Sequence, residues 1–455
     1  MKQFTIRSKQ AVIVVMLFLS AVSFTAAAQE KITLQMAVDR TLANNLTIKQ
    51  ALVNESLAIA DYDQSKYNQL PSVSAGPNAN YSFGRSQVPG QLLYESRTAF
   101  NVGASTSLQM TLFQGGQLRN QILQNKLNID VNKSNTAKVK NDLVLNVVTT
   151  YLQILTNQDL VAAAKQQIDI ANQTLERSQI SFDVGNQTLA DLSQAKAQVS
   201  TATLNLTTAQ NQLDLTTLIL KQYMEMDPNT PIIIEKPDVS RLTNIQTLYN
   251  SNEVIKTALA VNPDVQLAEN RQKTSFQAIK IAKGSYYPTL SMFGNLNTNY
   301  SNLAPLFVNG VRVPYSFGNQ FNNNFNQSIG VNLQIPIFNR YQARTNVTKA
   351  NLNYKNAELT TQIAKNTLSK TIIQAVQDLQ AAEKQYQSAT QTFEANRDAL
   401  NVTEQRYNVG LVNSLNYNTA VTNFTQAQNN MIQARYTVIF RSKVIDYYLG
   451  NPISL

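Results

Sequence analysis

The chain has 455 residues, with 38 Lys and Arg against 28 Asp and Glu, a formal charge of +10, and no His, Cys or Trp. Without His and Cys it cannot build histidine-based catalytic triads, Cys-His nucleophile pairs, disulfides or the usual zinc sites. Its basic residues are scattered singly and it has no glycine-rich phosphate loop, so nucleic-acid binding and nucleotide chemistry find little support. We therefore expect a protein that is not an enzyme and that uses no cofactor or metal.

Residues 1–28 have the pattern of a secretory signal peptide. Lys2, Arg7 and Lys9 precede an apolar run of 14 residues, and three alanines ending at Ala28 supply a small-residue cleavage site. The apolar run is shorter than the roughly 20 residues that a membrane-spanning helix needs. We expect the mature chain to begin near Gln29 and to work outside the cytoplasm.

A helical segment from 34 to 68 precedes two segments in which apolar and small polar residues alternate, at about 72–83 and 100–112. This alternation predicts strands, and their length and uncharged polar face suit a membrane β-barrel with lipid outside and water inside. Two hairpins of a soluble sheet are the alternative. The apolar positions are Val73, Ala75, Ala79, Tyr81 and Phe83 in the first strand, and Phe100, Val102, Ala104, Leu108, Met110 and Leu112 in the second.

A continuous helix is predicted from 117 to 183, because apolar residues recur every three or four positions and no proline interrupts them. At about 1.5 Å per residue the rod is roughly 100 Å long. Such a stripe is typical of a coiled-coil seam rather than of a binding face. Its members are Leu143, Val147, Tyr151, Ile154, Val161, Ile168 and Leu175.

The rod ends at Val184 and Gly185, where glycine can adopt the left-handed conformation that reverses a chain. Thr188 is placed to cap the next helix, and Asp191 follows three residues later, as in a capping box. We expect the chain to turn within 182–188 and to run back as a helix of about half the length, from 189 to 222.

The same parts then recur in the same order. A linker at 227–252 contains three prolines and one short apolar run, III, that reads as a strand. Beyond it we predict a helix at 253–286, strands at about 289–300 and 325–337, a helix at 342–408, a turn at 407–413 capped by Ser414, and a return helix at 415–448.

Direct sequence matches connect the two halves. Phe182, Val184 and Gly185 match Tyr407, Val409 and Gly410 at an offset of 225, and LQMTLFQGGQLRN matches LQIPIFNRYQART at the same offset. LPSVSAG matches YPTLSMF at an offset of 217, which implies a longer loop in the second copy. We interpret the chain as a duplicated element, with one structural repeat at 29–226 and another at 253–455, rather than as a solenoid of many short repeats.

Four strands cannot form a closed barrel, and an open sheet in lipid would leave two edges of unpaired backbone groups. Each unpaired group in hydrocarbon costs several kcal/mol, so other chains must cover these edges. Three copies would supply twelve strands, which is enough for a barrel with a lumen. The strand pattern therefore predicts a homotrimer surrounded by lipid.

This order of parts resembles that of the TolC-like outer-membrane efflux proteins, over nearly the whole mature chain. The most specific marks are the paired turns FDVG (182–185) and YNVG (407–410), the strand starts PSVS and PTLS, and LFQGG at 112–116. The resemblance implies a mainly α fold with membrane β: a trimeric twelve-strand β-barrel in the outer membrane, continuous with a twelve-helix α-barrel that extends into the periplasm. The linker at 227–252 would belong to an equatorial segment.

The resemblance also implies the function. The trimer would be a passive outer-membrane channel of a tripartite efflux or type I secretion system. It would dock at its tip to a periplasmic adaptor (membrane fusion) protein, and through it to an inner-membrane pump of the RND, ABC or MFS type. The adaptor-docking residues would be Val184, Gly185, Asn186, Val409, Gly410 and Leu411.

The second tip departs from the family at its gate. In the family, acidic residues six and nine positions after the tip glycine narrow the channel, whereas this chain has Asn416 and Thr419 there. Tyr407 keeps the tip tyrosine, but Val412 replaces its basic partner. In the first copy Asp191 keeps an acid at the sixth position.

We expect the periplasmic constriction to be held by helix packing and by hydrogen bonds from residues 416–418 instead of by carboxylate rings. Exposed ion pairs contribute under about 1 kcal/mol each, so replacing them by amides need not leave the tip open. The constriction residues would be Asp191, Tyr407, Asn416 and Thr419.

Two other functions remain open from the sequence. A periplasmic coiled-coil scaffold would account for the long helices but not for the strands or the signal peptide. An independent outer-membrane diffusion porin would account for the strands but not for the long helical segments.

Overall fold

The computed structural model describes residues 30–87, 92–237 and 248–451. The predicted signal peptide and the loop that contains Pro89 and Gly90 lie outside the described residues. The chain divides into two compact units, each described by itself below. Unit 1 comprises Met1–Leu46, Asn141–Val254 and Ile372–Leu455, and unit 2 comprises Thr47–Lys140 and Ile255–Thr371. Within the described ranges, no helix is both long enough and apolar enough to span a bilayer.

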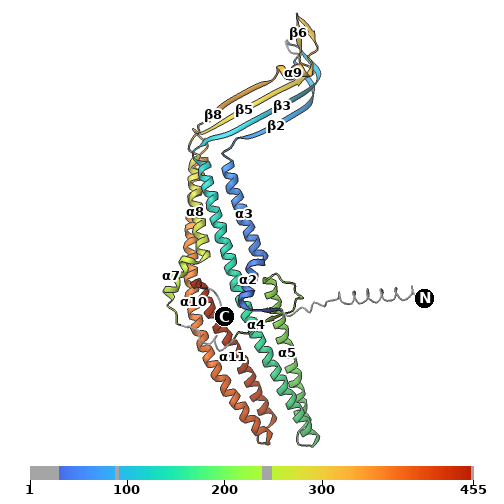
Figure 1. The fold of residues 1–455 in the computed structure, drawn as a ribbon, viewed down its shortest axis with the longest axis vertical. Coiled ribbons are helices and arrows are strands. Elements are labelled where there is room, and N and C mark those ends of the chain that lie inside the picture. Colours follow the sequence, from blue (N-terminus) through green and yellow to red (C-terminus); the bar gives the residue numbers. More distant parts are fainter. Residues whose placement is uncertain (1–29, 88–91, 238–247, 452–455) are drawn as a thin grey trace, which may run out of the picture. The chain divides into compact units, whose positions relative to one another are not determined.

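The elements follow one another in an order that occurs twice, with three short additional elements in the second series (Figure 1). The first series is β1 (Glu30–Ile32), α2 (Leu34–Asn44), α3 (Leu46–Tyr67), β2 (Ser72–Gln87), β3 (Tyr94–Gln114), α4 (Gln117–Asp183) and α5 (Leu189–Tyr223). The second is β4 (Ile232–Ile234), α7 (Ser251–Val261), α8 (Pro263–Gly284), β5 (Thr289–Ser301), β6 (Leu306–Val308), β7 (Val311–Val313), α9 (Phe317–Asn323), β8 (Asn326–Gln334), α10 (Gln342–Asn408) and α11 (Ser414–Leu449).

The expected long helices, return helices and strands are confirmed, with different strand limits. The first two strands are longer than expected, whereas β8 ends at Gln334 and not at 337. The helices expected at 34–68 and 253–286 are each broken in two, which corrects the sequence prediction. Asn45 has an extended backbone (ψ 130°), and Asn262 caps α8 with Pro263 as the first helical residue.

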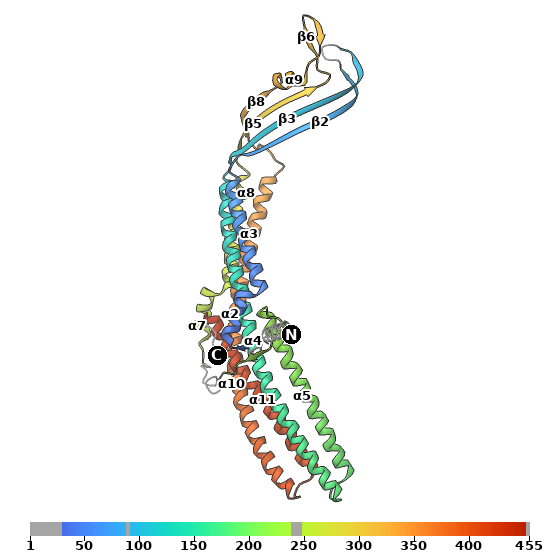
Figure 2. The ribbon, with the colours of Figure 1, turned by 45° about the vertical axis from the view of Figure 1, so that its right-hand side comes forward.

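Unit 2 contains a four-stranded antiparallel sheet in the order β2-β3-β5-β8, visible in Figures 1 and 2, and a small antiparallel pair of β6 and β7. Its register gathers the apolar residues on one face, because Val73 pairs with Leu108 and Met292 pairs with both Met110 and Val331. The opposite face carries small polar groups across the same strands: Ser74, Ser107, Asn295 and Ser328. Among the described residues, no strand pairs with the outer edge of β2 or of β8.

The junctions between the last strand and the long helix show the same backbone in both halves of unit 2. Gly115 and Gly116 have φ values of +55° and +74°, and the residues 225 positions later, Arg340 and Tyr341, have φ values of +54° and +60°. Gly115 has a second constraint, since a Cβ there would lie 2.2 Å from the carbonyl oxygen of Gly284. The left-handed turn therefore recurs without its glycines.

The core of unit 1 surrounds a small parallel sheet of β1 and β4. The hydroxyl of Tyr151 on α4 shares its proton between the carbonyl oxygens of Ile32 (3.1 Å) and of Glu235 (2.7 Å), which directly follows β4, and thereby attaches both strands to the helix. Nearby, Asp159 accepts from Lys236, Arg435 and the hydroxyl of Tyr436. These contacts connect the segment after α5 to both α4 and α11.

The predicted seam of α4 is confirmed, with a gradient along its length. Its members from Leu143 to Val161 are buried, whereas Ile168 and Leu175, nearer the turn, are half-buried. In the second hairpin, Leu400, Tyr417 and Phe424 form a separate small core between α10 and α11. The second hairpin thus has a packed apolar cluster close to its turn.

Candidate functional site

The two hairpin turns, α4–α5 and α10–α11, have the same backbone geometry. In the first, the N–H of Gly185 donates to Phe182 (2.9 Å) and that of Asn186 donates to Ser181 (2.8 Å). In the second, Gly410 donates to Tyr407 (3.0 Å) and Leu411 donates to Arg406 (2.9 Å). This pair of bonds is a Schellman motif, and both glycines have the left-handed φ that it requires, +79° and +75°.

Apolar side chains protrude from both turns. Val184 in the first turn and Val409 and Leu411 in the second are exposed, with Val409 at 70%. A Cβ placed on either turn glycine would meet no atom within 4 Å, so both turns present an open surface. The structure thus puts the predicted docking residues where a protein partner can reach them.

The helices that leave the turns are capped differently. Thr188 and Asp191 form the predicted capping box at the start of α5. The cap of α11 is Asn413, whose side chain accepts from the N–H of Asn416, and not Ser414 as the sequence had suggested. Ser414 is the first residue of α11, which leaves its hydroxyl available for another partner.

That partner is Asp191. Its carboxylate accepts from the Thr188 N–H (3.1 Å) and hydroxyl (2.7 Å), and also from the Ser414 hydroxyl (2.7 Å). The bonds from Thr188 and Ser414 hold the pKa of Asp191 below its ordinary value of 3.8, because they favour the charged carboxylate. Asp191 therefore both caps α5 and connects the first hairpin to the second.

Two stacked tyrosines make a second connection between the hairpins. The rings of Tyr407 and Tyr417 lie 4.8 Å apart and nearly parallel, and Gln187 of the first turn donates to the Tyr407 hydroxyl (3.0 Å). Burial raises the pKa of Tyr417, although a hydrogen bond with Thr174 on α4 opposes that shift. Tyr417 is thus a neutral, packed group at neutral pH.

A third connection is an ion pair. Arg177 on α4 donates to Asn408 (2.9 Å) and approaches Glu404 on α10 at 3.4 Å. Both charged side chains are more than one-third exposed, so this pair contributes under about 1 kcal/mol.

The two predicted constriction residues Asn416 and Thr419 are not part of these connections. Both are exposed in the single chain, and the Thr419 hydroxyl donates to Leu415 of its own helix. Of the predicted constriction set, the structure brings Asp191 and Tyr407 into the connections between the hairpins. The assignment of a gate to Asn416 and Thr419 remains a prediction.

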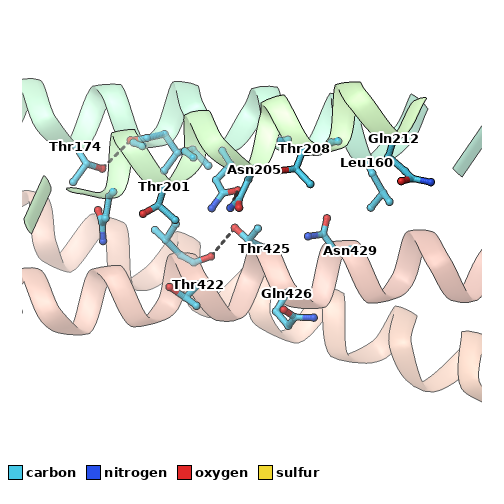
Figure 3. A pocket seen from close by; sticks show the side chains of 18 of the residues that line it. Leu160, Thr174, Thr201, Asn205, Thr208, Gln212, Thr422, Thr425, Gln426 and Asn429 are labelled. Carbon is cyan, nitrogen blue, oxygen red and sulfur yellow. Dashed lines mark hydrogen bonds between the residues drawn. The ribbon is translucent and has the colours of Figure 1, made fainter. Parts of the chain in front are cut away.

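A polar groove of about 730 Å³ lies between α4, α5 and α11 (Figure 3). Asn205 on α5 and Thr425 and Asn429 on α11 point toward one another across it. Its lining holds no Asp, Glu, Lys or Arg, and consists mainly of Asn, Gln, Thr and Ala. Such a surface offers hydrogen bonds to a helical partner without imposing a charge.

Sequence reasoning found the turns and Asp191 but missed Arg177, Gln187, Glu404 and Ser414 as partners between the hairpins. Each of these residues is an ordinary polar residue on a helix or in a turn. Their roles depend on which faces of the helices contact one another, and a local sequence pattern does not predict those contacts.

Comparison with known proteins gives a consistent result. The family model described as "Outer membrane efflux protein" matches residues 37–224 and 254–451. The chain is 22% identical to the outer membrane protein TolC of Escherichia coli over 450 residues, 96% of this chain and 86% of TolC. It is 23% identical to the toxin and drug export protein A of Aggregatibacter actinomycetemcomitans, over 89% of this chain and 83% of that protein.

Among solved structures, the CmeC outer membrane channel of Campylobacter jejuni has the same fold. The TM-score is 0.73 at 18% identity, and the match covers 92% of this chain and 85% of CmeC. The family match covers most of both series of elements and agrees with the paired turns and the four-stranded sheet. This chain belongs to the outer membrane efflux protein family.

Proposed function

We propose that the protein is the passive outer-membrane duct of a three-part efflux or type I secretion system, and that it works as a homotrimer. The observation that carries the proposal is the sheet of β2, β3, β5 and β8. It has one continuous apolar face, one polar face, and two edges that no described strand pairs. In lipid such a sheet is stable only when other copies cover both edges.

The faces of the sheet support a path for cargo. The apolar face would meet lipid, and the polar face would line a lumen of Ser, Asn and Thr side chains. Uncharged small side chains hydrogen-bond with water and bind few solutes tightly. This agrees with a duct that conducts whatever an inner-membrane pump delivers.

The match of one family model to two successive stretches, 37–224 and 254–451, supports the duplication. Each repeat would contribute two strands and one hairpin, so three copies would place twelve strands in the barrel and six hairpins in a helical tunnel. The names of the relatives, which include toxin and drug export, support export as the activity. Both secretion and drug efflux are compatible with these names.

The tips support the proposed partners. Exposed Val184, Val409 and Leu411, together with the polar groove beside them, offer a surface for a periplasmic adaptor that connects the duct to an inner-membrane pump. The three connections between the hairpins would hold the resting tip narrow. Opening would then require the second hairpin to separate from the first.

The orientation of the sheet can be tested with single tryptophans, because the chain has none. Val331→Trp lies on the apolar face and Ser328→Trp on the polar face of the same strand. In vesicles, lipids brominated on their acyl chains should quench the fluorescence of Val331→Trp, and aqueous iodide should quench that of Ser328→Trp. A soluble sheet would show no quenching by brominated lipid in either variant.

The partner can be tested separately. The intact protein should co-purify in mild detergent with an adaptor encoded beside it, and should support export only in its presence. If trimers conduct equally well and export proceeds without any adaptor, the protein is an independent porin.

A further inference from the structure

Six aromatic rings form an unbroken row across the apolar face of the sheet. Successive ring centroids are 6.3, 4.6, 6.4, 5.1 and 4.6 Å apart. In order, the rings belong to Phe83, Tyr81, Phe100, Tyr300, Phe317 and Phe321. The first four are on β2, β3 and β5, but the last two are on the short helix α9, which lies where the fourth strand would continue.

Helix α9 takes the place of β8 along the upper part of β5. β8 begins opposite Asn297, whereas β5 continues to Ser301. The buried side-chain amide of Gln320 accepts from the Ser301 N–H (2.9 Å) and donates to the Ser301 carbonyl oxygen (3.0 Å), as a strand residue would. Asn324 donates to the carbonyl oxygen of Asn299 (2.7 Å). α9 is therefore held firmly against the edge of β5.

The two outer edges of the sheet have unequal lengths. β2 has 16 residues and β8 has nine. When β8 pairs with β2 of a neighbouring copy, β2 extends beyond the end of β8, where α9 lies. Phe83, at one end of the ring row, is 79% exposed in the single chain, and at the other end Phe317 is 48% exposed and Phe321 is half-buried.

We propose that α9 is a docking surface for a second copy of this chain, and that it receives the upper half of the neighbour's β2. Phe317 and Phe321 of one protomer then pack against Tyr81 and Phe83 of the next, and the ring row continues around the whole barrel. This assignment rests on the proposed trimer, and it names the segment that joins the copies above the strand pairing.

Cross-linking between introduced cysteines can test this contact, because the chain has no cysteine of its own. Asn322 is exposed and lies two residues after Gln320, which at about 100° per residue puts it on the side of α9 away from β5. Phe83→Cys combined with Asn322→Cys should give covalent dimers and trimers with a short bismaleimide on a denaturing gel. Val73→Cys, at the other end of β2, combined with Asn322→Cys is the matched control and should give monomers.

Native mass spectrometry of the same samples separates the possible failures. Particles of three copies that give only monomer bands with Phe83→Cys and Asn322→Cys would overturn the docking of α9 and leave the proposed duct intact. Monomeric particles would overturn both.

A second measurement uses full-length protein without cysteines. Phe317→Ala should lower the temperature at which trimers dissociate in detergent by several degrees, while Phe307→Ala, an exposed aromatic of β6 outside the row, should not change it. If Phe317→Trp is quenched by brominated lipid and Phe317→Ala leaves the trimers unchanged, lipid and not a neighbouring chain covers α9, and the inference is wrong.

Discussion

The two hairpin turns share one backbone geometry but differ in the side chains on either side of it. At matching positions, the first hairpin has Phe182, Thr188, Asp191 and Leu192, and the second has Tyr407, Asn413, Asn416 and Tyr417. The first therefore carries the acid and the second carries the two stacked hydroxyl-bearing rings. The difference indicates that the turn itself is a common scaffold, whereas the residues that flank it connect the two hairpins to each other.

The largest effect is expected from a change in the turn, whose backbone geometry is the same in both hairpins. Gly410→Val puts a β-branched residue at a φ of +75°, which costs more than about 1–2 kcal/mol and distorts the turn, although no atom obstructs the new Cβ. Trimers should remain in the membrane, but export in cells that supply the adaptor and pump should be lost. Gly410→Asn, which tolerates this conformation, should keep export. Export at the wild-type rate with valine would mean that the tip is not the docking site.

Among the positions that differ between the two hairpins, substitution of Tyr417 should cause the largest loss of stability. It is buried, so Tyr417→Ala should cost about 3 kcal/mol and make the turn of the second hairpin sensitive to protease. Tyr417→Leu copies the buried Leu192 of the first hairpin and should cost about 1 kcal/mol. Denaturant unfolding and limited proteolysis would measure both variants. Equal losses for the two variants would contradict this expectation, because they would show that the stacked ring itself, and not the buried volume that leucine restores, stabilises the second hairpin.

The hydrogen bond from Ser414 to Asp191 should have a moderate effect on opening. Ser414→Ala removes this bond and keeps the cap of α5, so at about 1 kcal/mol the open probability in planar bilayers should rise about five-fold. Thr188→Ala removes the cap hydroxyl but keeps the connection, and should destabilise α5 with little change in opening. If the two variants open alike, the cap and not the connection controls the tip.

The smallest effects concern pH and cations. Because the folded-state pKa of Asp191 is lowered, its stabilising contribution is present above the ordinary value of 3.8 and is lost as the pH falls through the lower folded value. Conductance should therefore change little between pH 7 and about 4, and multivalent cations should block only weakly from the periplasmic side. Asn416→Asp with Thr419→Asp should add a strong, pH-sensitive cation block. Wild-type protein that already shows this block would contradict our placement of the constriction.

Local patterns were sufficient to predict most of the fold. Alternation in 72–83 predicted a strand because one face must be apolar, and the glycines at 185 and 410 marked the turns because few other residues adopt a positive φ. The break between α7 and α8 also has a local signal that the prediction of one helix did not use, since the residue before a proline disfavours the helical conformation. The break at Asn45 carries no comparable signal.

The connections within the site could not be predicted in the same way. That Ser414 donates to Asp191, and Gln187 to Tyr407, depends on the rotation of whole helices about their axes. The sequence showed only that the loop containing α9 is longer in the second copy. A helix of seven residues has little periodic pattern, and α9 is held instead by the bonds that Gln320 donates to Ser301 and that Thr298 of β5 donates to Phe321.

The central claim is that three copies of the chain close one duct, and the copy number of the membrane-extracted protein tests it most directly. Native mass spectrometry in mild detergent, with circular dichroism of the same sample, should find three copies per particle together with an intact β signal. A stable monomer that keeps its β signal would contradict the account, because the open edges of β2 and β8 would then need no partner.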